Sequence, residues 1–185
     1  MNFQKVFNRV TSRLDESGIR YALIGGFAMA LRGVQRATIH LDFILMLEDL
    51  EKADAIFTEA GYRRAFHSEN VSHYISEDSE LGRIDILHAF RGPTLSMLER
   101  AERIEVEAGY SLPVVEIEDL IGLKVQAIVN DPKRSTWDWA DIRMMLETCS
   151  ETGQAIDWQL LQEYMDLLHL GDKLAELKDW HDSTN

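Results

Sequence analysis

Cysteine is nearly absent from this chain of 185 residues, in which Cys149 stands alone. One cysteine can form neither an intramolecular disulfide nor a thiolate metal cluster, so the composition favours a reducing compartment, and we expect a cytoplasmic protein. Long apolar runs are missing too. The most apolar segment, residues 41–47, contains Asp42 and is far shorter than the roughly 20 residues that cross a bilayer. Because the amino terminus also lacks the apolar stretch of a signal peptide, the sequence predicts neither membrane insertion nor secretion.

Positive charge is scarce as well. Nineteen Lys and Arg residues stand against 32 Asp and Glu residues, which gives a formal net charge of −13. Since proteins grip nucleic acid by displacing counterions with Lys and Arg, long DNA is not an expected ligand. A local basic site for one nucleotide, or for the end of an RNA, stays open because several cations could gather on one side: Arg32, Arg36, Arg63, Arg64, Lys133 and Arg134.

The apolar pattern predicts a single α/β unit, and the 45% hydrophobic content is enough for one core. Residues 3–14 show the i, i+3, i+4, i+7 spacing of an amphipathic helix, which Gly18 would end. Short β-branched and apolar segments bounded by turn residues predict a mixed sheet. The expected strands are 20–24, 38–47, 62–67, 71–76 and 81–90 with a strand pair around Gly109, and the expected helices are 27–31, 49–60, 93–103, 118–129, 136–148, 157–168 and 174–180.

A glycine pair, Gly25-Gly26, separates the first strand from the helix that follows it. Two glycines at this place let the backbone approach a ligand closely and direct helix N–H groups at an anion such as a triphosphate. An ordinary tight turn would give the same pattern. The sequence matches neither a dinucleotide-binding G-x-G-x-x-G turn nor a P-loop, so the glycine pair alone does not identify a site.

Two strand patterns carry carboxylates. Side chains two apart in a strand share a face, so His40 and Asp42 emerge together while Leu41 and Phe43 enter the core. A solvated sheet face would explain this pair equally well. A further carboxylate, Asp85, stands between isoleucines in a later strand, where aspartate is disfavoured unless something stabilises it. A cation held between two neighbouring strands is one such stabilising partner.

In this order, the motifs resemble those of the DNA polymerase β-like nucleotidyltransferase superfamily. Its pattern is a Gly-rich turn, a carboxylate pair on the next strand and a third carboxylate later, matched here by Gly25-Gly26-Phe27-Ala28 through Gly33, Arg36, Thr38, His40-Leu41-Asp42 and Asp85. The sequence is most similar to the AbiEii-type branch, which includes toxins of toxin–antitoxin systems, because residues 118–124 and 137–142 also look like theirs. The resemblance covers residues 14–146. It implies a nucleotidyltransferase core at 1–110, with a mainly helical part at 111–185 packed on it as one compact unit.

The resemblance also implies metal-assisted chemistry. In this superfamily two metal ions bridge the carboxylates and clamp the nucleotide's phosphates, and an acceptor hydroxyl attacks the α-phosphate as pyrophosphate leaves. Asp42 would be the carboxylate that bridges both ions, and Asp85 the one that helps to deprotonate the acceptor. His40 takes the place of the first carboxylate. Mg²⁺ or Mn²⁺ is the expected cofactor, although Mg²⁺ prefers oxygen ligands to an imidazole.

Five residues are expected to contact the nucleotide: Gly25, Gly26, Arg36, Thr38 and Lys124. Lys124 shares a helix side with apolar neighbours. It would therefore either extend its ammonium group to water or, as the resemblance implies, contact a phosphate. Asp138 and Asp141 follow at i, i+3 spacing. They would form a solvated acidic edge or, by the resemblance, hold a basic group near the site.

The other histidines give an alternative. A zinc hydrolase could use His40, Asp42, Asp85 and His88, but strand alternation sends Asp85 and His88 to opposite faces. Histidines on separate strands, such as His67 and His73, are most often simply hydrogen-bonded. Trp137 and Trp139 are expected to pack in the core.

Three functions are consistent with these features. The first is an enzyme that transfers a nucleoside monophosphate from a nucleoside triphosphate to a hydroxyl of a small molecule, an RNA end or a protein. The second is a catalytically impaired nucleotide-binding or toxin–antitoxin-type interaction protein of the same fold, for which His40 is the discriminating residue. The third is a purely structural partner of another protein. A homo-oligomer or a cognate antitoxin are the macromolecular partners we expect.

Overall fold

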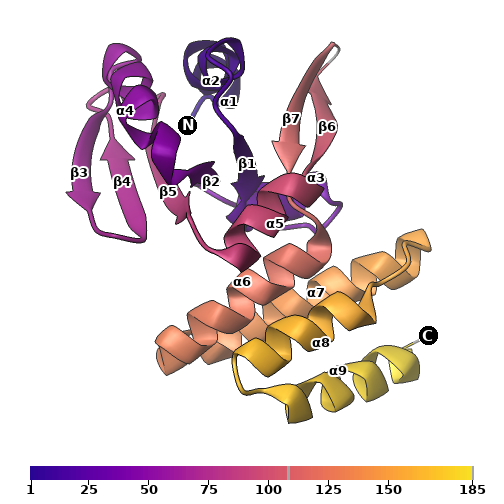
Figure 1. Cartoon of the computed structure of the whole chain (residues 1–185). Helices are drawn as coiled ribbons and strands as arrows, with labels where there is room; N and C mark the ends of the chain where they lie inside the picture. Colours follow the sequence, from indigo (N-terminus) through magenta and orange to yellow (C-terminus); the bar gives the residue numbers. More distant parts are fainter. Residues whose placement is uncertain (108, 185) are drawn as a thin grey trace. The chain divides into compact units, whose positions relative to one another are not determined.

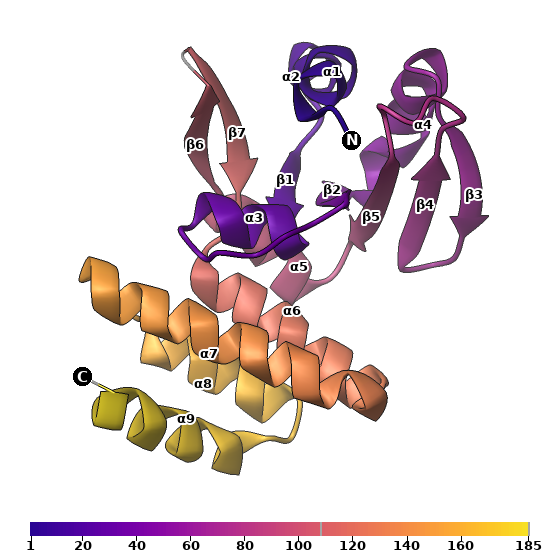
Figure 2. The same ribbon diagram turned by 180° about the vertical axis from the view of Figure 1, so that it is seen from behind.

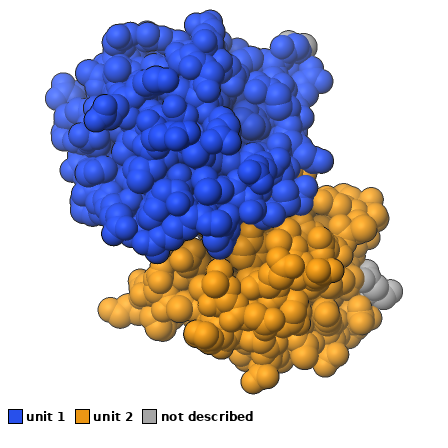
Figure 3. Space-filling model, viewed as in Figure 1, with its two compact units in different colours: residues 1–31, 35–116 blue, residues 32–34, 117–185 orange. Residues whose placement is uncertain are grey.

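The computed structural model describes residues 1–107 and 109–184 and divides them into two compact units, residues 1–31 with 35–116 and residues 32–34 with 117–185 (Figure 3). The boundary follows Glu116 rather than residue 110. The reason is that residues 110–114 form a strand of the sheet, which pairs with the first strand of the chain. The expected packing of the helical part on the core as one compact unit stays a prediction.

The first unit is built on a seven-stranded mixed sheet in the order β3-β4-β5-β2-β1-β7-β6 (Figure 1). The middle strands β1 and β2 are antiparallel, whereas β2 and β5 are parallel. Hairpins extend the sheet at both ends, since β3–β4 and β6–β7 are antiparallel pairs. The strands are β1 Tyr21–Ile24, β2 His40–Met46, β3 Arg63–His67, β4 Val71–Ile75, β5 Arg83–Ala89, β6 Glu102–Glu107 and β7 Tyr110–Val114.

Alternation along the central strands separates a buried face from a more open one. Leu41 and Phe43 on β2 and Ile84 and Ile86 on β5 are almost fully buried, as the spacing of apolar residues predicts. On the same face, Phe57 of a covering helix lies 4.5 Å from the ring of Tyr74 on β4. The residues between them, among which are the polar positions of β2 and β5, point to the other face.

Helices connect and cover these strands, as both views of the ribbon show (Figures 1 and 2). A continuous helical segment precedes β1 and contains a π-helical turn in its middle. The helical segments of this unit are α1 Phe3–Val6, η1 Phe7–Thr11, α2 Ser12–Glu16, α3 Gly25–Leu31, η2 Leu47–Asp49, α4 Leu50–Glu59 and α5 Gly92–Arg100.

The second unit is helical. Its α6 packs against both α7 and α8, and Gly122 of α6 lies directly against the ring of Tyr164 of α8. The Tyr164 hydroxyl donates a hydrogen bond of 2.7 Å to Asp119 Oδ1, which closes the same contact. The elements are α6 Ile117–Asn130, η3 Pro132–Arg134, α7 Ser135–Thr152, α8 Trp158–Leu167 and α9 Gly171–Thr184.

Most expected elements are present, and their bounds differ at several ends; α9, for example, begins at Gly171 rather than at residue 174. The helix expected over 93–103 ends at Arg100, because Glu102 and Arg103 pair with β7 as part of β6. The second strand begins at His40 rather than at residue 38. Trp137 is 72% exposed and is not a core residue. The strand pair around Gly109 is confirmed, although residue 108 lies outside the described residues.

Within the described part of the chain, every helix is too short or too polar to cross a bilayer.

We predict that Gly122→Ala destabilises the protein, although alanine is the better helix former by about 1 kcal/mol. An added Cβ would lie 2.8 Å from the Tyr164 ring, and overpacking of a well-packed contact costs about 1–3 kcal/mol. Urea unfolding measures the difference. Gly92→Ala is the control, because its Cβ would meet nothing within 4 Å. Equal stability of the Gly122→Ala variant and the unmodified protein would contradict the close α6–α8 contact.

Candidate active site

Strand register brings three of the predicted site residues together. Asp42 on β2 lies directly opposite Asp85 on β5, and His40 stands two residues before Asp42 on the same face. One ligand atom from each of the three lies within 4.8 Å of the other two. His40 Nε2 lies 3.3 Å from Asp42 Oδ2. The arrangement is a compact, half-buried donor set of one imidazole and two carboxylates.

The glycine turn forms one wall of this cluster. Ile24, the last residue of β1, pairs with Asp42 across the antiparallel ladder, so Gly25 follows beside that carboxylate. Gly25 has a φ of +68°, and a Cβ at this position would lie 2.7 Å from Asp42 Cγ. Both the left-handed backbone and the space therefore require glycine here. Any larger residue would have to displace Asp42.

Arg36 and Thr38 lie at the second glycine. A Cβ at Gly26 would be 3.1 Å from Thr38 Cβ and 3.8 Å from Arg36 Cγ. The Thr38 hydroxyl donates to the carbonyl of His40 at 3.0 Å and so ties the incoming loop to the start of β2. Gly25 thus lies against the carboxylate of Asp42, and Arg36 and Thr38 lie beside Gly26, the next residue of the turn. Their contact with a nucleotide stays a prediction.

Two side chains hold Asp85 in place. Its Oδ1 accepts a hydrogen bond of 2.6 Å from Arg83 Nε and lies 2.7 Å from His73 Nδ1. His73 comes from β4, whose register sets it directly opposite Asp85. The ring of Phe66 on β3, half exposed, stacks on the other side of His73 with centroids 5.2 Å apart. Sequence reasoning did not assign His73 to the site, because the register between two antiparallel strands cannot be read from their residue patterns.

Positively charged or protonatable side chains stand beside both carboxylates of the cluster. A hydrogen bond with Asp42 raises the pKa of His40 above its ordinary value, although partial burial acts in the opposite direction. Arg83 supplies a fixed positive charge beside Asp85. Two carboxylates held close together repel each other, and these cationic neighbours offset that repulsion.

Lys124 lies in the second unit, on α6. Its Nζ is 2.7 Å from Asp138 Oδ1 and 2.6 Å from Asp141 Oδ2, and both aspartates are buried on α7. Arg134 Nε also donates to Asp138. The solvated acidic edge considered for Asp138 and Asp141 is therefore wrong, since they hold a basic group. A phosphate contact by Lys124 stays a prediction.

The remaining strand histidines are hydrogen-bonded away from the cluster. His88 is buried and contacts Ser72 Oγ through Nε2 and the carbonyl of Glu69 through Nδ1. His67 Nδ1 lies 2.9 Å from the same Ser72 oxygen. His88 is thus on the face opposite Asp85, as strand alternation predicts, and it does not complete a four-residue zinc site.

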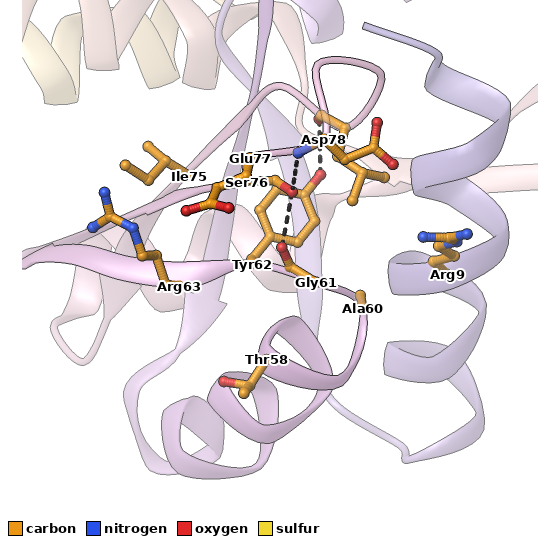
Figure 4. A pocket seen from close by; sticks show the side chains of 11 residues that line it. Arg9, Thr58, Ala60, Gly61, Tyr62, Arg63, Ile75, Ser76, Glu77 and Asp78 are labelled. Carbon is orange, nitrogen blue, oxygen red and sulfur yellow. Dashed lines mark hydrogen bonds between the residues drawn. The ribbon is translucent and has the colours of Figure 1, made fainter.

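A cavity of about 370 Å³ lies elsewhere in the first unit, where the first helical segment approaches the ends of α4, β3 and β4 (Figure 4). Figure 4 shows Arg63 and Arg9 on either side of the Tyr62 ring. Hydrogen bonds from Tyr62 to Leu81 and from Ser76 to Gly61 bind its walls together. His40, Asp42 and Asp85 do not line this cavity, so it is separate from the donor set.

Solved structures with the same arrangement of elements include enzymes that modify antibiotics. The solution structure of the antibiotic-resistance factor ANT(2'')-Ia is 18% identical, matches 99% of this chain and 100% of its own, and has a TM-score of 0.63. Its crystal structure in complex with adenylyl-2''-tobramycin is 16% identical over 98% of each chain, with a TM-score of 0.60. The chain has a polymerase β-like nucleotidyltransferase fold.

A third structure supports this assignment of the nucleotidyltransferase fold. The lincosamide antibiotic adenylyltransferase LnuA, bound to lincomycin, is 12% identical over 77% of this chain and 94% of its own, with a TM-score of 0.55. Neither the family models nor the curated proteins contain a match to the sequence. At these identities the structural likeness establishes the fold, and the chemistry has to be argued from the residues themselves.

We predict that Asp138→Asn reduces the loss of stability in acid. Burial alone would raise the pKa of Asp138, but hydrogen bonds and charge from Lys124 and Arg134 lower it below the ordinary value of 3.8. A carboxylate with a lowered folded-state pKa contributes stability above its unfolded-state pKa, and that contribution is lost as pH falls through the folded-state pKa. Urea unfolding between about pH 5 and about pH 3 should therefore show a smaller decrease in the free energy of unfolding for the variant.

The exposed aspartate Asp179, on α9 of the same unit, provides the control as Asp179→Asn. If Asp138→Asn and Asp179→Asn lost stability with falling pH as steeply as the unmodified protein, the Lys124–Asp138 ion pair would not contribute to acid stability.

Proposed function

We propose that this protein is a metal-dependent nucleotidyltransferase, which transfers a nucleoside monophosphate from a nucleoside triphosphate to a hydroxyl group. One observation carries the proposal: the donor set of His40, Asp42 and Asp85 lies against the Gly25 turn in a fold shared with adenylyltransferases. Asp42 fits against the turn only because Gly25 has no side chain. Carboxylates on an ordinary solvated sheet face would not require such a glycine.

Different residues of the chain bind the triphosphate and take part in the transfer. Gly26 packs closely against Thr38, with Arg36 beside it, so that a triphosphate at this turn would meet main-chain N–H groups and one guanidinium. The attacking hydroxyl forms a bond to the α-phosphorus, the bond to pyrophosphate breaks, and pyrophosphate leaves. Asp85, which Arg83 and His73 hold in place through Oδ1, helps to take up the hydroxyl proton. A bound divalent metal would supply charge neutralisation for the phosphate oxygens.

The donors suit a divalent cation only in part. Asp42 and Asp85 offer the oxygen ligands that Mg²⁺ prefers. His40 offers a nitrogen, which Mn²⁺ accepts more readily than Mg²⁺ does. We therefore propose Asp42 and Asp85 as the ligands of the metal in either case, with His40 as the residue that decides which metal supports turnover.

The chemical class of the acceptor is supported less directly. ANT(2'')-Ia has been captured with adenylyl-2''-tobramycin, and LnuA with lincomycin, which makes a small hydroxyl-bearing molecule the first class to test. RNA ends and protein hydroxyls are the other two. Transfer of label from an α-labelled nucleoside triphosphate to each class, with Mg²⁺ and with Mn²⁺, distinguishes among them.

A second function is favoured by His40. A carboxylate at position 40 would supply a negatively charged oxygen ligand. A histidine at this position supplies a neutral nitrogen instead, which weakens the binding of a hard cation such as Mg²⁺. The alternative is a catalytically impaired, AbiEii-like protein that binds nucleotide and acts through a partner, such as a cognate antitoxin. Nucleotide binding without transfer under both metals would select this alternative.

We predict that Asp42→Asn abolishes metal-dependent nucleotide binding. Asparagine fills the same space beside Gly25 but removes the negative charge that a divalent cation needs. Calorimetry with ATP and Mn²⁺ should show binding to the unmodified protein and a loss of at least tenfold in affinity for the variant, which corresponds to about 1.4 kcal/mol, because the cation loses one of its charged ligands. Adenosine should bind much more weakly than ATP. Equal affinities for ATP and adenosine would refute phosphate recognition by the glycine turn.

We predict that His40→Asp increases transfer supported by Mg²⁺. The change adds a second charged oxygen beside Asp42, on the strand face that already carries the site. Initial rates with each metal give the comparison, and the ratio of the Mg²⁺ rate to the Mn²⁺ rate should rise at least tenfold. If the unmodified protein transfers nucleotide well with Mg²⁺ and His40→Asp is neutral or harmful, then His40 does not weaken the site.

A further inference from the structure

The distance between two donors of the site fits a shared ion. His40 Nε2 and Asp42 Oδ2 lie 3.3 Å apart, a separation at the long end of the range for an N–H···O hydrogen bond. Two ligands about 2.0–2.1 Å from one tetrahedral ion lie roughly 3.3–3.4 Å from each other. The imidazole nitrogen and the carboxylate oxygen are therefore already separated as two ligands of one cation would be.

Asp85 presents a single oxygen to this position. Its Oδ1 is engaged by His73 Nδ1 and Arg83 Nε, which leaves Oδ2 for a metal. A ligand atom of Asp85 lies within 4.8 Å of a ligand atom from each of His40 and Asp42. Because one carboxylate oxygen is already used and the other carboxylate faces His40, the donor set serves one ion better than it serves two.

The chemistry of the donors selects the ion. Imidazole and carboxylate together suit divalent transition metals such as Zn²⁺, Co²⁺ and Mn²⁺, whereas Mg²⁺ is a hard, octahedral ion that is bound through oxygen. A metal-bound carboxylate is commonly oriented by a hydrogen bond from behind. His73 occupies that place for Asp85, and Phe66 stacks on its ring.

We propose that His40 Nε2, Asp42 and Asp85 hold one divalent transition-metal ion, which the site prefers over Mg²⁺, and that His73 positions Asp85 for it. The role of this ion in catalysis rests on the proposed transferase function, but its binding does not. The ion-binding half of the proposal can thus be tested without any substrate.

Metal binding to the full chain, stripped of metal by a chelator, provides the test. Titration with Co²⁺ should give one bound ion per chain and a visible absorption band, with an affinity roughly a hundredfold higher than that for Mg²⁺. With Mn²⁺ bound, electron spin-echo envelope modulation should show coupling to an imidazole ¹⁴N nucleus. This signal is measured on the unmodified protein, so it does not depend on the folding of any variant.

Three variants assign the ligands. His40→Asp should remove the ¹⁴N coupling and reduce the preference for Co²⁺ over Mg²⁺ at least tenfold. His73→Gln should keep the ¹⁴N coupling but weaken Co²⁺ binding between tenfold and a hundredfold, as loss of an outer-shell partner does. His67→Gln is the matched control, because His67 is an exposed strand histidine bonded to Ser72, and it should change neither quantity. Circular dichroism confirms that each variant is folded.

The outcomes separate this inference from the proposed function. Absence of Co²⁺ binding, equal affinities for Co²⁺ and Mg²⁺, two bound ions, or Mn²⁺ binding without ¹⁴N coupling would each overturn the single transition-metal site. Efficient Mg²⁺-supported transfer without nitrogen coupling would overturn it while supporting the transferase. A nitrogen-coupled Mn²⁺ ion in a protein that transfers no nucleotide would support the site and reject the transferase.

Discussion

The parallel pairing of β2 with β5 is the constraint on which the site depends. Seven consecutive residue pairs hold this register, from His40 opposite Arg83 to Met46 opposite Ala89. A shift by one residue would place an isoleucine opposite Asp42 and turn buried side chains to the open face. The apolar residues of the two strands, packed on the covered face, therefore fix the distance between the two carboxylates. The core thus specifies the site geometry before any ligand binds.

This constraint brings like charges together, and the surrounding residues compensate for it. Asp42 has His40 as its neighbour, whereas Asp85 has Arg83 and His73. In the second unit a positive charge likewise pairs with buried aspartates, since Lys124 forms ion pairs with both Asp138 and Asp141. In both places, removal of one charge would leave an unpaired partner that is costly to bury.

The sequence was sufficient to predict the local elements and the site face, but not the contacts that depend on register between distant strands. Alternation predicted that His40 and Asp42 share a face, and the resemblance to nucleotidyltransferases implied the glycine turn beside them. The pairing of His73 with Asp85 depends on where the hairpin between β4 and β5 turns, which residue periodicity does not reveal. The end of α5 was placed too late because Glu102 and Arg103 gain strand partners in β7, and tertiary pairing overrides helix propensity there. Trp137 was expected to be a core or helix-packing residue, yet its side chain is largely exposed to solvent.

The central claim is that the carboxylates of β2 and β5 and the Gly25–Gly26 turn form one metal and triphosphate site. A crystal structure with Mn²⁺ and a non-hydrolysable nucleoside triphosphate tests it most directly, because anomalous scattering locates the ion independently of the nucleotide. The account predicts an anomalous peak within bonding distance of Asp42 and Asp85, about 2.0–2.2 Å from their oxygens, with the triphosphate along the glycine turn. A triphosphate bound elsewhere, or a manganese ion that contacts neither aspartate, would contradict it.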